Sequence, residues 1–350
     1  MFYDIFSSFL KQTDPEVAHQ LAIKFLKTNF IPFDLFRFKG HENLKSKVFG
    51  INFDNPVGLA AGFDKNAEVY NSIYKLGFGF AEVGTITPKP QEGNPKPRVF
   101  RFNEEKAIIN RLGFPNDGME KIHNRIENNR NNGIIGINIG PNKENATKND
   151  DYLTCIEKFY DLADYFAVNI SSPNTPNLRS LHDKEKITDL IDVLFSFRKS
   201  REKIKPIIFK LSPNIDETEI NDLSKVFLDK NIDGLILSNT SVEGKENLSG
   251  ENNKEDGGLS GSPIYSLSNK IILKFYRNIK GKVPIIGVGG VSDGETAYEK
   301  IKCGANLIQL YTSMVFKGPY IASNINEELV ELLNKDGFNN ISEAVGVNAN

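Results

Sequence analysis

Eight short apolar runs, rich in β-branched residues, alternate along this chain with eight longer amphipathic stretches. The short runs have the length and composition of buried strands, and the longer ones have the periodicity of helices that cover a sheet. This alternation predicts a parallel sheet, and eight such units close naturally into a barrel. We therefore predict an α/β protein, a (β/α)8 TIM barrel with a short N-terminal helical extension. The predicted strands are 57–60, 80–84, 134–138, 165–169, 206–211, 234–238, 283–288 and 306–310.

The predicted helices follow these strands and carry recognisable start and stop signals. Asp150 and Asp216 are expected N-caps, and Gly304 follows the seventh helix. The helices cover about 66–76, 117–131, 151–163, 184–199, 217–230, 264–279, 293–302 and 320–334. A doubly wound open sheet uses the same alternation and stays an alternative. Against it, the glycine cluster 287–290 does not extend to the GxGxxG pattern of dinucleotide-binding sheets.

Composition excludes several classes of function. A formal net charge of -2 gives no electrostatic reason to expect nucleic acid as a partner. The four histidines show no metal-ligand spacing, so we expect no metal. Cys155 and Cys303 are expected to be packed thiols, and no secretory signal follows Met1. We therefore expect a protein of a reducing compartment.

Polar residues stand at the C-terminal ends of the predicted strands, which is where barrel enzymes hold their active sites. Two lysines, several amides and several hydroxyls converge there, which predicts a large polar ligand with anionic groups. The glycines after strand seven and the polar residues after strand eight indicate a phosphate site. These strand ends are 61–66, Thr85, Asn138, 169–174, Lys210, 238–240, 289–290 and 311–312.

One strand end stands out, because residues 169–176 read Asn-Ile-Ser-Ser-Pro-Asn-Thr-Pro after the apolar run 165–168. Pro173 and Pro176 forbid both helix continuation and central strand pairing. The segment is too polar for a core. We therefore expect chemistry in this loop.

These strand ends together resemble the class 2, quinone-dependent dihydroorotate dehydrogenases. Six motifs carry the resemblance in the family's order, and it extends from about residue 1 to residues 341–344. The motifs are Gly58–Asn66, Gly84–Gln91, Asn110–Phe114, Asn169–Pro176, Gly257–Gly261 and Gly287–Gly290. The resemblance implies oxidation of (S)-dihydroorotate to orotate through FMN, with electrons passed to a membrane quinone, in the de novo pathway to UMP.

The resemblance also implies roles for individual residues. Lys65 offers a positive charge to the substrate carboxylate, and asparagines offer both donor and acceptor edges to its ring. Lys210 is implied to stabilise negative charge on the flavin. The implied FMN contacts are Ala61, Gly62, Phe63, Asp64, Lys65, Thr85, Asn138, Asn169, Lys210, Ser238, Gly261, Gly290, Tyr311 and Thr312. The implied substrate contacts are Lys65, Asn110, Arg111, Leu112, Gly113, Phe114, Asn169, Asn174, Asn239 and Thr240.

By the same resemblance, Ser172 is the general base that removes a proton from the carbon beside the substrate carbonyl. A serine needs assistance for this task, from water, from polar neighbours or from the acidity of the substrate. Two other enzyme classes stay open. Ser172 with His182 can be read as part of a hydrolase triad, although a GxSxG elbow is missing. Lys210 can be read as the Schiff-base lysine of a barrel aldolase.

The other class of the family uses a cysteine base and a soluble electron acceptor. Here the base position holds Ser172, and about 40 residues precede the first barrel motif. These residues predict two amphipathic helices, one with the apolar face Phe2, Ile5, Phe6, Phe9 and Leu10. The second has the stripe Val17, Ala18, Leu21, Ala22, Phe25 and Leu26, begins at Asp14-Pro15, and is followed by the aromatic tail 30–38.

This extension is expected either to pack on the barrel or to lie at a bilayer surface, where it opens a path for the quinone. Residues 1–38 carry four basic and four acidic side chains, so membrane association would rest on apolar burial. Arg101 is the residue that the resemblance places beside the quinone head. We predict two parts, residues 1–40 as the extension and 41–350 as the catalytic barrel. We expect a monomeric peripheral protein on the cytoplasmic face of a bacterial inner membrane.

Overall fold

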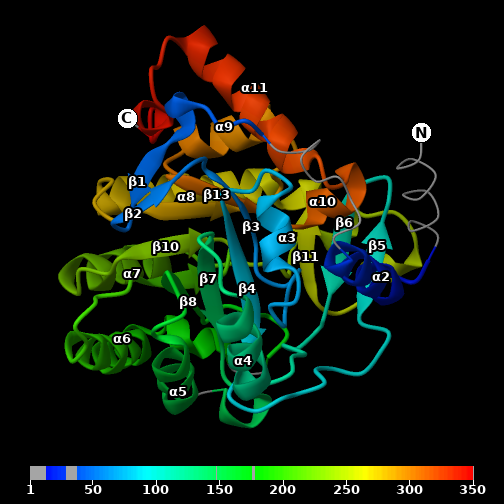
Figure 1. Ribbon diagram of the computed structural model, residues 1–350, viewed down its shortest axis with the longest axis vertical. Helices are drawn as coiled ribbons and strands as arrows, with labels where there is room; N and C mark the ends of the chain where they lie inside the picture. The colour runs from blue at the N-terminus through cyan, green and yellow to red at the C-terminus, as the bar shows by residue number, and fades with distance from the viewer. Residues whose placement is uncertain (1–12, 29–37, 147, 176–177, 350) are drawn as a thin grey trace.

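The computed structural model describes residues 13–28, 38–146, 148–175 and 178–349, and its centre is a closed barrel of eight parallel strands (Figure 1). β9 and β10 pair and complete the ring, so the predicted TIM barrel is confirmed and the open-sheet alternative is wrong. Each predicted strand corresponds to one barrel strand. In spatial order these are β10 (Gly234–Leu237), β12 (Ile285–Val288), β13 (Leu307–Leu310), β3 (Val57–Leu59), β4 (Phe80–Ile86), β7 (Ile134–Ile139), β8 (Tyr165–Asn169) and β9 (Ile207–Leu211).

Helices surround the barrel at the predicted places. Asp216 caps its helix through a capping box with Glu219, as predicted. Asp150 is not an N-cap, because the helix starts one residue earlier than expected and Asn149 takes that position. The helices are α3 (Tyr70–Tyr74), α4 (Met119–Asn129), α5 (Asp150–Phe159), α6 (Lys184–Lys199), α7 (Glu217–Asp229), α8 (Tyr265–Ile279), α9 (Gly294–Lys302), α10 (Thr312–Lys317) and α11 (Ile321–Asp336). The short α10 was not predicted.

Side chains alternate between the two faces of the barrel wall, as the pleat of a strand requires. In β9, Ile207 and Phe209 face the helices, whereas Ile208 belongs to a second cluster inside the barrel. The inner cluster is apolar toward the start of the strands. Farther along the strands the inward positions become polar, as at Lys210. The barrel interior is therefore apolar near the start of the strands and polar near their ends.

A β-hairpin closes the floor of the barrel. β1 (Ser46–Val48) and β2 (Ile51–Phe53) pair antiparallel, and Figure 1 shows them on the far side of the molecule from α2. The Phe53 ring meets the Phe80 ring edge-on at a centroid distance of 5.2 Å. Gly58 leaves space for Phe80, since a Cβ there would lie 2.2 Å from the ring. The sequence analysis did not predict this hairpin.

A small sheet stands beside the mouth of the barrel, and it too was not predicted. It contains β5 (Val99–Phe102), β6 (Ala107–Asn110) and β11 (Gly258–Gly261), with β6 between the other two strands. The polar stretch 242–256 leads into β11 through two 3-10 turns, η5 (Lys245–Asn247) and η6 (Glu251–Lys254). Both strand pairings of this small sheet are antiparallel.

The second predicted N-terminal helix is present as α2 (Pro15–Lys27), with Asp14 as its N-cap. It lies against β5 (Figure 1), and Glu16 forms an ion pair with Arg98 at 2.9 Å. The first predicted helix and the tail to residue 37 lie outside the described residues. None of the described helices is long and apolar enough to cross a bilayer.

The hairpin floor generates a prediction about stability. Phe53→Ala should lower the free energy of unfolding by about 3–5 kcal/mol, because it leaves a cavity beneath Phe80. Phe53→Leu, which fills most of that volume, should cost much less. Urea unfolding measures both variants, and equal losses for the two would contradict the packing role.

Candidate active site

A cavity of about 1490 Å³ lies at the C-terminal ends of the barrel strands. It exceeds the range of roughly 300–1,000 Å³ that is usual for one small ligand, so it has room for more than one. The cavity runs from the polar upper layer of the barrel to α2, which contributes residues from Pro15 to Lys27 to its wall. The chain therefore builds one continuous space between the barrel mouth and the N-terminal helix.

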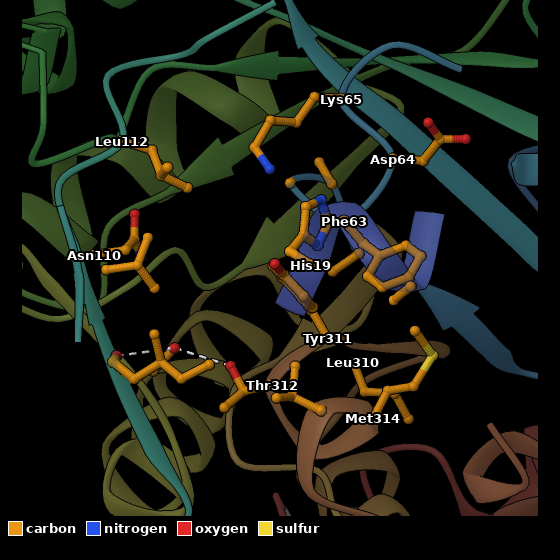
Figure 2. A pocket seen from close by; sticks show the side chains of 18 of the residues that line it. His19, Phe63, Asp64, Lys65, Asn110, Leu112, Leu310, Tyr311, Thr312 and Met314 are labelled. Carbon is orange, nitrogen blue, oxygen red and sulfur yellow. Dashed lines mark hydrogen bonds between the residues drawn. The ribbon is translucent and has the colours of Figure 1, made fainter. Parts of the chain in front are cut away.

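Two lysines supply positive charge to this cavity. Figure 2 shows Lys65 directing its ammonium group into the cavity, whereas the neighbouring Asp64 carboxylate points away from it. Burial lowers the pKa of Lys65 to about 8, although Glu16 and Asp64 raise it. Lys210 rises from β9, and its burial lowers its pKa while Glu82 raises it. Both charges are poorly solvated, so each gains by pairing with an anion.

Asparagines and a threonine form a connected layer beneath the cavity. Asn169 donates to the Thr85 hydroxyl at 3.1 Å, and that hydroxyl donates to Asn138 Oδ1 at 2.6 Å. Asn239 donates to Asn169 Oδ1 at 3.1 Å. Thr85 reaches this layer because the register of β4 shifts between Val83 and Ile86, which turns an extra residue inward.

The loop after β8 brings Ser172 into the cavity. Its side chain is 5% exposed, and its Oγ accepts the backbone N–H of Asn174 at 3.2 Å. Asn174 in turn donates to Asn110 Oδ1 at 3.2 Å. His182 lies in the turn η4 (Leu178–His182), and among the described residues no hydrogen bond joins it to Ser172. The geometry of a Ser-His pair is therefore not present in this part of the chain.

Glycines bring the backbone close to the other side of the cavity. Gly261, Gly289 and Gly290 have φ of +98°, +117° and +72°, a region that other residues adopt rarely. The Oγ of Ser313, which also lines this wall, is buried without a hydrogen-bond partner among the described residues. A Cβ at Gly261 would lie 2.1 Å from Lys106 O, and one at Gly290 would lie 2.5 Å from Tyr265 Cβ, so glycine lets the backbone of this wall pack closely against its neighbours.

The structure brings nearly all of the predicted site residues to this one cavity, with two exceptions. Asn138 is fully buried beneath the residues that line the cavity. Arg111 faces away and pairs with Glu255 at 2.6 Å. Asp64 belongs to the wall, but its carboxylate caps the turn before α3 by accepting from Glu68 and Val69. The side chains of Arg111 and Asp64 are therefore committed to structure rather than to a ligand.

Sequence reasoning missed the groups that complete the site. Glu82 and Gln309 are polar residues inside apolar strands, and their inward positions follow from the strand period of two. His19 belongs to α2 and points toward the barrel mouth, with its ring 5.3 Å from Phe63 (Figure 2). Burial and the nearby Lys65 hold the pKa of His19 well below its usual value. A lone histidine on an amphipathic helix carries no signal of this kind.

Comparisons with known proteins agree with this geometry. Residues 43–333 match the family model described as dihydroorotate dehydrogenase. A curated relative from Bartonella tribocorum named dihydroorotate dehydrogenase (quinone) is 44% identical over 345 residues, 96% of this chain and 94% of its own. A relative of the same name from Parvibaculum lavamentivorans is 43% identical, with 96% of each chain covered.

Solved structures give the same result. The crystal structure of DHODH from Eimeria tenella in complex with ferulenol superposes with a TM-score of 0.92 at 36% sequence identity, covering 96% of both chains. The ligand-free structure of the Eimeria tenella protein gives a TM-score of 0.92 at 37% identity, covering 96% of this chain and 99% of that one.

The charge at Lys65 generates a prediction about pH. We expect a carboxylate ligand such as orotate to pair with the protonated amine, so its affinity should fall as pH rises through about 8, by up to about tenfold per pH unit. Lys65→Met should weaken orotate binding roughly 10- to 100-fold and remove this dependence. Titrations between pH 7 and 9 measure both effects, with Lys274→Met on the surface of α8 as control. An unchanged profile in Lys65→Met would show that another group binds the carboxylate.

Proposed function

Because this chain belongs to the dihydroorotate dehydrogenase family, we propose that it oxidises (S)-dihydroorotate to orotate in the cavity at the barrel mouth, with bound FMN passing the electrons to a membrane quinone. The activity is that of the quinone-dependent class, an oxidoreductase step of pyrimidine biosynthesis. The observation that carries the assignment to this cavity is the meeting of Lys65, Lys210 and Ser172 in one space that also reaches α2.

The residues present suit FMN as the flavin. Gly261, Gly289 and Gly290 line the cavity, and beside them the Oγ of Ser313 has no hydrogen-bond partner among the described residues, so we place the phosphate there. Lys210 lies in the polar layer, where its charge would face the electron-rich ring. When bound, FMN supplies the hydride acceptor for the reaction. The other proposed contacts are Ala61, Gly62, Phe63, Lys65, Thr85, Asn169, Ser238, Tyr311 and Thr312, and Asn138 is proposed to act on the flavin through the Thr85 hydroxyl.

The substrate is proposed to lie between the flavin and the Ser172 loop. Lys65 pairs with its carboxylate, and Asn110, Asn174 and Asn239 bind its ring amides. The Oγ of Thr240 lines the same wall, buried without a partner among the described residues. An unsatisfied hydroxyl and several amides match a ligand with several polar edges. The proposed contacts also include Leu112, Gly113, Phe114 and Asn169.

Ser172 is proposed to take the proton from the carbon beside the substrate carbonyl. Its Oγ accepts the N–H of Asn174, and this contact stabilises the negative charge that develops on that oxygen when its own proton passes to a water molecule in the cavity. The site is screened from bulk water, since Ser172 is 5% exposed, and this strengthens the contact. Asn174 thus gives Ser172 part of the assistance that a serine base requires.

This assignment predicts the behaviour of two variants. Ser172→Ala should keep FMN yet lose the rate of flavin reduction by dihydroorotate by about 100-fold or more, the usual scale for a general base. Ser172→Cys, which keeps an ionisable group at the same place, should retain more of that rate at high pH. Anaerobic stopped-flow measurements follow the flavin absorbance. Reduction of Ser172→Ala at the wild-type rate would remove Ser172 from the mechanism.

The quinone is proposed to enter beside α2. The cavity reaches α2, and the rings of Phe63 and Tyr311 lie between this helix and the barrel. Their centroids are 5.6 Å apart. Arg101 lines the same wall, where burial lowers its pKa while Asp14 and Tyr311 raise it. We place Arg101 beside the quinone head, because a guanidinium can donate to a carbonyl in an otherwise aromatic space.

The outer face of α2 supports association with a membrane surface. Val17, Leu21 and Phe25 are 46%, 37% and 45% exposed, and their spacing of four places them on one stripe. The predicted apolar stripe thus has an exposed part and a buried part, since Ala18 and Leu26 are buried. We propose a peripheral protein on the cytoplasmic face of a bacterial inner membrane, with residues 1–40 as the contact and 41–350 as the catalytic unit. We propose that the protein acts as a monomer.

The membrane proposal is tested by changing Val17 and Leu21, which do not line the cavity. The double variant Val17→Ser/Leu21→Ser should float less with liposomes and turn over a long-chain quinone more slowly, because apolar burial drives the association. Reduction of a soluble dye should not change. Val193→Ser/Ile204→Ser is the matched control, since these residues are 37% and 58% exposed elsewhere on the surface. Equal flotation of the two double variants would contradict the proposal.

A further inference from the structure

A carboxylate lies inside the barrel, below the cavity and outside every role assigned so far. Glu82 stands in β4 with no exposed surface. It accepts hydrogen bonds from Asn138 Nδ2 at 2.7 Å, from Gln309 Nε2 at 2.8 Å and from Tyr165 Oη at 3.2 Å. A buried carboxylate is costly unless several donors satisfy it, and here three strands supply one donor each.

The donors above Glu82 form a chain that runs in one direction. Asn239 donates to Asn169, Asn169 donates to Thr85, and Thr85 donates to Asn138. Asn138 then donates to Glu82. The upper end is fixed separately, because Asn239 Oδ1 accepts the backbone N–H of Thr240 at 2.8 Å. Every hydrogen bond along this chain therefore points down toward the carboxylate.

Such a chain must end on a group that needs to donate nothing in return. An amide or hydroxyl both donates and accepts, whereas an ionised carboxylate only accepts. A glutamine here would keep only one acceptor oxygen, so its NH2 would have to face either Asn138 Nδ2 or the pair Gln309 Nε2 and Tyr165 Oη. Where the NH2 faces Asn138, that amide is driven to turn over. Its oxygen would then leave Thr85, and the hydroxyl of Thr85 would lose its acceptor.

We propose that Glu82 is a positioning residue that holds the amides and hydroxyl of this chain with the donor and acceptor edges that the flavin requires. It does so by ending the chain as a pure acceptor. Burial lowers the pKa of Lys210, and the Glu82 carboxylate in the same polar layer raises it. The inference rests on the proposed function, since Thr85 and Asn169 are proposed flavin contacts.

The direct test is Glu82→Gln, which keeps the shape and adds an NH2. It should weaken FMN binding roughly tenfold, the scale of one mismatched buried contact. It should also shift the flavin midpoint potential to a more positive value, because a negative charge near the cofactor is lost. Tyr165→Phe is the control, since it removes a donor to Glu82 and leaves both the carboxylate and Asn138 in place. It should change FMN affinity little.

A swap variant separates hydrogen-bond direction from simple loss of packing. In Glu82→Gln/Asn138→Asp the amide and the carboxylate exchange places, so residue 82 donates upward and residue 138 accepts from both sides. FMN affinity, or folding if the single variant does not fold, should recover. An unchanged FMN affinity in Glu82→Gln, or a swap variant that restores nothing, would overturn the inference. Reduction of the wild-type flavin by dihydroorotate tests the proposed function separately, because it does not depend on either variant.

Discussion

Closure of the sheet is the constraint on which the rest of this structure depends. Once β9 pairs with β10, every second side chain of eight strands must share one interior. The chain fills the lower part with rings and aliphatic groups such as Phe80 and Ile208, and the hairpin seals it. The upper part receives lysine, amide and carboxylate groups instead. Polar groups that are far apart in the sequence are thereby forced into contact in a dry environment, where their electrostatic interactions are strong.

Much of this arrangement could be predicted from the sequence, because strand period and strand ends are local signals. All eight strands were expected, and the residues after them do meet in one cavity. Other features depend on contacts that no local pattern encodes. Thr85 was expected at the site, but the register shift of β4 that turns it inward has no local signal, and Arg111 turns away because Glu255, far along the chain, pairs with it. The helix before residue 13 lies outside the described part of the chain and stays a prediction.

The cavity has a polar part at the barrel mouth and an aromatic part beside α2. On the polar side, Lys65 and Ser172 are proposed to serve an anionic substrate. On the side of α2, the rings of His19, Phe63 and Tyr311 pack against one another (Figure 2). The ion pair of Glu16 with Arg98 holds α2 against the small sheet that carries the substrate wall. The helix α2 can therefore face an apolar electron acceptor, while the barrel holds the substrate in the polar part of the cavity.

The central claim is that electrons pass from dihydroorotate to a quinone through a flavin in this cavity. The most direct measurement is anaerobic mixing of the purified, flavin-containing protein with dihydroorotate, followed by addition of a quinone. The account predicts bleaching of the visible flavin absorption with formation of orotate, and then its return when the quinone is added. A flavin that dihydroorotate does not reduce would contradict the claim. A reduced flavin that fumarate or NAD reoxidises in preference to quinone would contradict its second half.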